Sequence, residues 1–93
     1  MEQQFIAAWL ASREKAAKIG VRLRPMKEED AMRTAHRFLS GHRERDGFQI
    51  LADKDRLDLS LEALAVSKKF TALFTDEEAN NALTRLLSAG YRF

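Results

Sequence analysis

The stretch that decides the fold is Thr75-Asp76-Glu77-Glu78-Ala79-Asn80-Asn81-Ala82-Leu83-Thr84-Arg85-Leu86-Leu87-Ser88-Ala89-Gly90. Its first four residues form a capping-box pattern, in which Thr75 and Glu78 each satisfy a backbone N–H at the start of a helix. Gly90 is typical of the residue that ends a helix. The stretch therefore predicts a helix over residues 76–89. We expect its apolar side to be Ala79, Ala82, Leu83, Leu86 and Leu87, and its opposite side to be Glu77, Asn80, Asn81, Thr84 and Arg85.

Helical spacing also occurs in three segments before this one. Residues 60–74 have apolar side chains on several sides, so we expect this helix to be central in the fold. Residues 3–19 and 26–40 each have an apolar face, and Gly20 and Gly41 follow them. Residues 47–58 fit a short helix, which we favour, or a hairpin.

The fold class predicted from these segments is all-α, a compact bundle of four or five helices. One short pattern repeats, because Gly20-Val21-Arg22-Leu23 and Gly90-Tyr91-Arg92-Phe93 both read Gly, apolar, Arg, apolar after a helix. The repeat allows a minimal β-ribbon between residues 21–24 and 91–93, and coincidence is the alternative.

Length and composition bound the function. The 93 residues suit one domain, residues 1–93, and 45% hydrophobic with 32% charged residues is the composition of an ordinary globular protein. The chain has no cysteine, which excludes disulfides, thiolate metal sites and thiol catalysis. Its two histidines, His36 and His42, do not have metal-ligand spacing, and no nucleophile or phosphate-loop motif occurs. We therefore expect no cofactor, no metal and no enzymatic activity.

No stretch approaches the roughly 20 apolar residues that a membrane span needs. The apolar run from Phe5 to Ala11 follows Glu2 rather than a basic residue, so it differs from a signal peptide. A cytoplasmic location is the expectation.

Charge is unevenly distributed along the chain. Residues 13–45 carry ten Lys and Arg against five Asp and Glu, a net charge of +5, whereas the whole chain is only +2. A basic segment of this kind favours phosphate contacts. Nucleic-acid binding is accordingly one of two functional predictions, with these candidate residues: Arg22, Arg24, Arg33, Arg37, Arg43 and Arg45.

The other functional prediction, which we prefer, is protein binding. Phe5 and Trp9 lie on a wide apolar arc of the helix over residues 3–19, and Arg13 falls near the middle of that arc. Trp and Arg are enriched at interface hot spots. The sequence thus predicts a small non-enzymatic regulatory or adaptor protein that docks on another protein, or on itself as a homodimer, through Phe5, Trp9 and Arg13. The alternative is that the arc packs inside the molecule and Arg13 marks its edge.

Overall fold

Helices form the regular structure of the chain. The computed structural model describes residues 2–21, 23, 26–41 and 47–91, and no strand occurs within those ranges. The elements there are α1 (Glu2–Lys18), η1 (Glu28–Asp30), α2 (Ala31–Ser40), α3 (Phe48–Asp53), η2 (Leu57–Leu59), α4 (Leu61–Ala65), η3 (Thr71–Leu73) and α5 (Asp76–Ser88), where η marks a single 3₁₀ turn. The predicted all-α class is confirmed.

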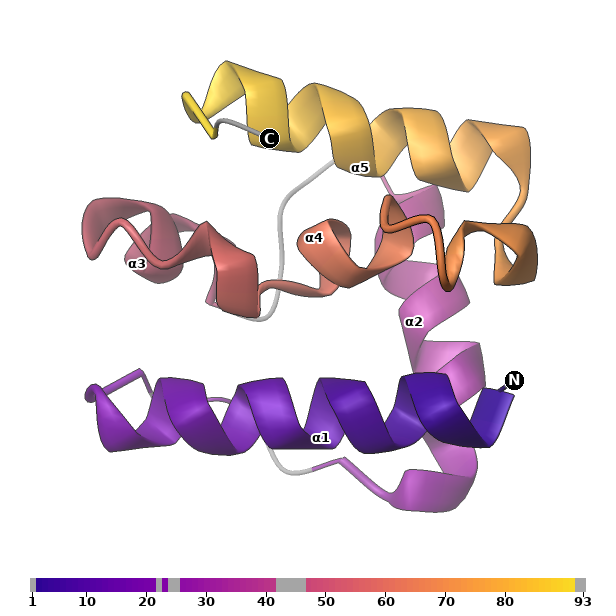
Figure 1. The fold of residues 1–93 in the computed structure, drawn as a ribbon, viewed down its shortest axis with the longest axis horizontal. Coiled ribbons are helices and arrows are strands. Elements are labelled where there is room, and N and C mark those ends of the chain that lie inside the picture. Colours follow the sequence, from indigo (N-terminus) through magenta and orange to yellow (C-terminus); the bar gives the residue numbers. More distant parts are fainter. Residues whose placement is uncertain (1, 22, 24–25, 42–46, 92–93) are drawn as a thin grey trace.

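The two longest helices lie on opposite sides of the bundle. Figure 1 shows α1 along one side and α5 along the other, with α3 and α4 between them and α2 crossing the other helices near one end. The short helix α4 contacts both α1 and α5, and α2 also contacts α1 and α5. The region around α4 is therefore central, as predicted.

The predicted continuous helix over residues 60–74 is wrong. The structure divides this segment into α4, a turn over residues 66–70, and η3. Ser67 ends the helical pattern, because its backbone N–H and its hydroxyl both donate to the Leu64 carbonyl, at 3.2 and 2.8 Å. Serine side chains compete with helical backbone bonds in this way. Because the chain turns here, Phe70 and Phe74 reach the core from outside a helix.

Other helix boundaries follow the sequence more closely. α1 and α5 match their predicted spans, and α3 confirms a short helix within residues 47–58 rather than a hairpin. The capping box of α5 is present, with Glu78 N to Thr75 Oγ1 at 3.1 Å and Thr75 N to Glu78 Oε1 at 2.9 Å. α2 begins at Ala31 instead of residue 26, because Lys27 is extended (φ −77°, ψ 136°) and the next three residues form the 3₁₀ turn.

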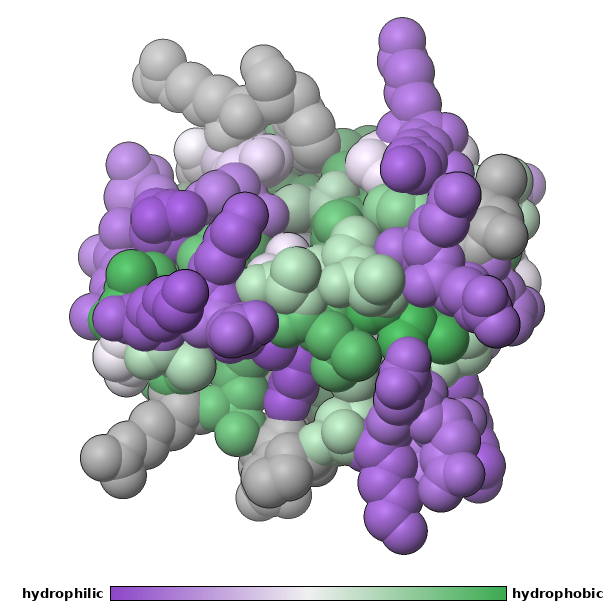
Figure 2. Space-filling view, turned by 60° about the horizontal axis from the view of Figure 1, so that its bottom comes forward, coloured by the Kyte–Doolittle hydropathy of each residue, from purple (hydrophilic) through white to green (hydrophobic). Residues whose placement is uncertain are grey.

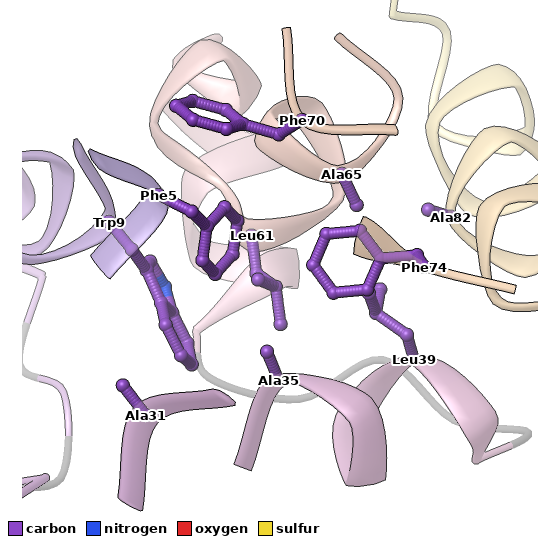
Figure 3. Packing of buried hydrophobic residues seen from close by; sticks show 10 residues of the cluster. All are labelled: Phe5, Trp9, Ala31, Ala35, Leu39, Leu61, Ala65, Phe70, Phe74 and Ala82. Carbon is purple, nitrogen blue, oxygen red and sulfur yellow. The ribbon is translucent and has the colours of Figure 1, made fainter. Parts of the chain in front are cut away.

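The hydrophobic core has two clusters of buried side chains. In the first, Phe5 of α1 lies 5.4 Å from the Phe70 ring and 5.2 Å from the Phe74 ring, centroid to centroid (Figure 3). Both pairs meet edge to face, which is a favourable arrangement for aromatic rings. The second cluster comprises Ala16, Val21, Phe48, Leu51, Leu57, Leu59 and Leu86.

A buried charge joins three helices. The Arg85 side chain of α5 is 8% exposed, and its Nη1 lies 3.1 Å from Oε2 of Glu62 in α4, which is 3% exposed. The same guanidinium donates to the carbonyls of Phe38 and Gly41 at the end of α2. One turn earlier on α5, Asn81 Nδ2 donates to the Leu39 carbonyl at 2.9 Å. α5 therefore satisfies carbonyls that the end of a helix leaves without an intrahelical partner.

Three helices end in the same hydrogen-bonded motif. At the end of α1, Val21 N bonds Ala16 O and Gly20 N bonds Ala17 O, and at the end of α5 Tyr91 N bonds Leu86 O. These bonds define Schellman motifs, in which the residue after the helix is left-handed. The left-handed residues are Gly20 (φ +90°), Gly90 (φ +82°) and, after α3, Asp55 (φ +57°).

The Schellman motifs explain the first two residues of the repeated Gly–apolar–Arg–apolar pattern. In both copies the glycine takes the left-handed conformation, and the apolar residue after it, Val21 or Tyr91, packs in the second core cluster. The predicted β-ribbon is not seen at Val21, Leu23 or Tyr91, and its remaining residues lie outside the described ranges.

We predict opposite stability changes at two of the left-handed positions. Gly20→Ala should lower the free energy of unfolding by about 1 kcal/mol, since a left-handed residue with a Cβ is disfavoured. An added methyl would meet no atom within 4 Å, so the backbone alone is tested. Asp55→Gly should raise the free energy of unfolding by roughly 0.5 kcal/mol. Urea unfolding monitored by circular dichroism measures both, and equal losses in the two variants would contradict the assignment.

Candidate functional site

The predicted partner-binding aromatics lie in the core. Phe5 and Trp9 are 0% and 1% exposed, and their rings pack 5.9 Å apart beside Ala31 and Ala35 (Figure 3). A partner cannot contact either ring in this fold. Arg13 lies partly buried with its Cζ 5.7 Å from the centroid of the Trp9 ring. This is the arrangement of the alternative interpretation, in which the arc packs inside and Arg13 covers its edge.

The structure describes only two of the six arginines predicted for nucleic-acid binding. Arg33 pairs with Asp30 at 2.9 Å, one turn away, and Arg37 lies over the Phe38 ring at 5.6 Å. The other four, Arg22, Arg24, Arg43 and Arg45, lie outside the described residues. The exposed ion pair of Arg33 is worth little energetically, so Arg33 stays accessible to an anion.

A polar cluster links α2 to α5 through the Glu78 carboxylate. Glu78 is buried and lies within 2.9 Å of His36 Nδ1 and 3.1 Å of the Ser40 hydroxyl. In a serine-hydrolase triad the hydroxyl bonds the imidazole, whereas Ser40 donates to the carboxylate and to the His36 carbonyl. The cluster thus holds two helices together and lacks the order of groups that activates a nucleophile.

Burial works to raise the pKa of Glu78, but hydrogen bonds oppose it. The Thr75 N–H contributes most to lowering the pKa, followed by the His36 ring and the Ser40 hydroxyl. The net result is a pKa below the ordinary glutamate value, because these donors stabilise the ionised form.

Metal binding finds no support in the described residues, which contain no group of three His, Asp or Glu side chains placed to hold an ion. Within the same part of the chain, no helix is long and apolar enough to cross a membrane.

The outward face of α5 is the surface that stands out. Leu83 and Leu87 are 37% and 57% exposed, although both are large and apolar. Beside them is a hollow of about 320 Å³, lined by Val66, Thr71, Ala79, Asn80 and Leu83. From Ala79 to Tyr91 the only charged residue is Arg85, and Arg85 is buried. We call the exposed side of Ala79, Asn80, Leu83 and Leu87 the α5 face.

The sequence pattern predicted the opposite orientation for part of this helix. Leu83 and Leu87 were expected in the core and Arg85 and Asn81 in solvent, but the two polar side chains turn inward to the end of α2. Ala82 and Leu86, which the sequence also places on the apolar side, are buried as predicted. The three leucines span about 100° of the helix, the width of an ordinary buried stripe, so their spacing alone does not predict that Leu83 and Leu87 face outward.

The chain matches no protein-family model, no curated protein and no solved structure, so its own residues carry the functional interpretation.

We predict that Glu78→Gln reduces the pH dependence of stability. A carboxyl whose folded pKa is lowered stabilises the protein above its unfolded pKa, which is near 4.5, and that stabilisation is lost as pH falls through the folded value. The wild type should therefore lose stability as the pH falls below 4.5. Glu78→Gln should be less stable at pH 7 and should change less over this range.

The control for this prediction is Glu77→Gln, an exposed neighbour in the same first turn of α5. Thermal melts of wild type, Glu78→Gln and Glu77→Gln are compared at pH 7 and at an acidic pH below 4.5. Identical acid dependence in wild type and Glu78→Gln would show that the Glu78 cluster does not stabilise the fold.

Proposed function

We propose that the protein is a small, non-enzymatic binding module that docks on a protein partner, a different protein or another copy of itself, through the α5 face. The observation that carries the proposal is an exposed leucine pair beside a hollow, on a segment of α5, residues 79–88, that exposes no charge. The proposal keeps the protein-binding prediction from sequence and moves its contact residues from α1 to α5.

The chemistry of the α5 face supports a protein partner. The centres of protein interfaces are depleted in charged residues and contain side chains that anchor in pockets. Full burial of a leucine side chain stabilises by roughly 1.5–3 kcal/mol. Leu83 and Leu87 are incompletely buried, so a partner that covers them gains part of that free energy on binding. Asn80 and Thr71 at the hollow supply polar groups that orient a bound side chain.

Nucleic acid is a poorer match to this face. Phosphate contacts need Lys or Arg, and the α5 face exposes neither. The nucleic-acid prediction continues to depend on the basic segment of residues 22–45.

We predict that Leu87→Glu abolishes docking and leaves the fold intact. Leu87 is an exposed side chain, so a carboxylate there stays solvated in the free protein and becomes costly only when a partner covers it. The matched control is Ile50→Glu on α3, since Ile50 is 45% exposed and lies outside the α5 face.

The measurement compares the proteins retained from an extract of the source cells by immobilised wild type, Leu87→Glu and Ile50→Glu. A retained protein that is lost with Leu87→Glu and kept with Ile50→Glu supports the proposal. Equal retention by all three would overturn the α5 face as the docking site, and salt-sensitive retention of nucleic acid alone would favour the other function.

A further inference from the structure

Resting on the proposed function, we infer that the partner which fits the α5 face is a second copy of this chain, packed antiparallel to form an isologous dimer. An isologous interface uses the same patch on both subunits, so the patch must be complementary to itself. The α5 face meets this condition in shape and in charge.

The shape argument starts from Leu87 and the hollow. Leu87 projects from the C-terminal half of α5, and the hollow is bordered by Ala79, Asn80 and Leu83, one to two turns earlier on the same helix. At 3.6 residues per turn, Ala79, Leu83 and Leu87 lie within an arc of about 80°. The projecting side chain and the hollow therefore face the same direction.

Antiparallel pairing brings these two features together twice. If the two-fold axis passes through Leu83, residue 87 of one helix lies opposite residue 79 of the other. Each Leu87 then enters the hollow of the opposite copy, and the two Leu83 side chains meet at the axis. This is packing of a side chain into a hole between helix residues, the arrangement that holds paired helices together. The hollow, at about 320 Å³, has room for a leucine side chain.

Charge gives the second, independent reason for a second copy. The other long surfaces of the molecule expose charges: Glu14, Lys15 and Lys18 on α1, Arg33 and Arg37 on α2, and Asp53 at the end of α3 with Lys54 directly after it. Covering Leu83 and Leu87 with any of those surfaces would bury charged groups, which is unfavourable. Another α5 face covers the leucines with the uncharged segment of residues 79–88, and the exposed Asp76 lies opposite residue 90, beyond the end of the other α5.

The α1 side is the competing surface of this chain. Figure 2, in which that side comes forward, shows an apolar patch framed by hydrophilic side chains. On α1 the fully exposed apolar residues are alanines such as Ala7 and Ala11, and the larger Ile6 and Leu10 are partly buried, so no large apolar side chain there is as exposed as Leu87. Pairing α5 of one copy with α1 of the next would be heterologous, and such contacts form open chains of subunits unless the rotation closes a ring.

The test is the mass of the full-length protein in solution. Multi-angle light scattering at about 0.5 mM should give twice the chain mass of 10.6 kDa for wild type, and Leu87→Glu should return to the mass of one chain. Ile50→Glu on α3 and Ala11→Glu on α1 should remain dimeric. A wild type that is monomeric at this concentration, or a dimer dissociated by Ala11→Glu and not by Leu87→Glu, would overturn the inference.

Cross-linking tests the position of the two-fold axis. Because the chain has no cysteine, Leu83→Cys introduces a single thiol that meets its symmetry mate at the axis. Under mild oxidation we expect a covalent dimer of Leu83→Cys and little dimer of the Ile50→Cys control. Equal rates for the two variants would overturn the inferred packing.

The experiments distinguish failure of the dimer from failure of docking through the α5 face. A monomeric wild type that retains a different protein, and loses it with Leu87→Glu, overturns the dimer and supports the docking function. If Leu87→Glu changes neither the mass nor the retained proteins, both are overturned.

Discussion

The arrangement of α2, α4 and α5 depends on the ion pair and hydrogen bonds of the buried Arg85 side chain. A buried guanidinium is unfavourable unless its donors are satisfied. Here Glu62 of α4 supplies the counter-charge, and the carbonyls of Phe38 and Gly41 at the end of α2 accept further hydrogen bonds. Three helices that are separated in sequence are thereby fixed relative to one another.

The same side chain determines which way α5 faces. Because Arg85 and Asn81 point toward the end of α2, Leu83 and Leu87 lie on the solvent-facing side of α5. The α5 face is therefore apolar, and it lacks charge because the one charged residue of that part of the helix is used inside. The polar core of the bundle and its proposed docking surface are two consequences of one helix rotation.

Much of the fold can be predicted from local sequence. The Thr75–Glu78 capping box and the glycines that follow α1 and α5 act within one turn of the chain, so their effects can be recognised without tertiary contacts. The break at Ser67 could not be recognised, because residues 60–74 keep helical apolar spacing while their carbonyls bond differently.

The candidate site was harder to predict, for a related reason. Helical periodicity assigns an arginine to solvent, and it carries no information about a distant Glu62 that makes burial favourable. Phe5 and Trp9 likewise match the composition of an interface. However, Phe70 and Phe74, which cover Phe5, come from a turn and from the residue after η3, far along the chain.

The most direct measurement is a double-mutant cycle between Glu62 and Arg85, with the free energy of unfolding determined in urea for wild type, Glu62→Leu, Arg85→Leu and the double variant. Breaking a buried pair from one side should cost about 3–5 kcal/mol. The double variant should lose less than either single variant, giving a coupling energy of at least about 2 kcal/mol. If Arg85→Leu is unfolded and the double variant is folded, the coupling between Glu62 and Arg85 is larger still. Costs that add within about 0.5 kcal/mol would contradict the central position given to Arg85.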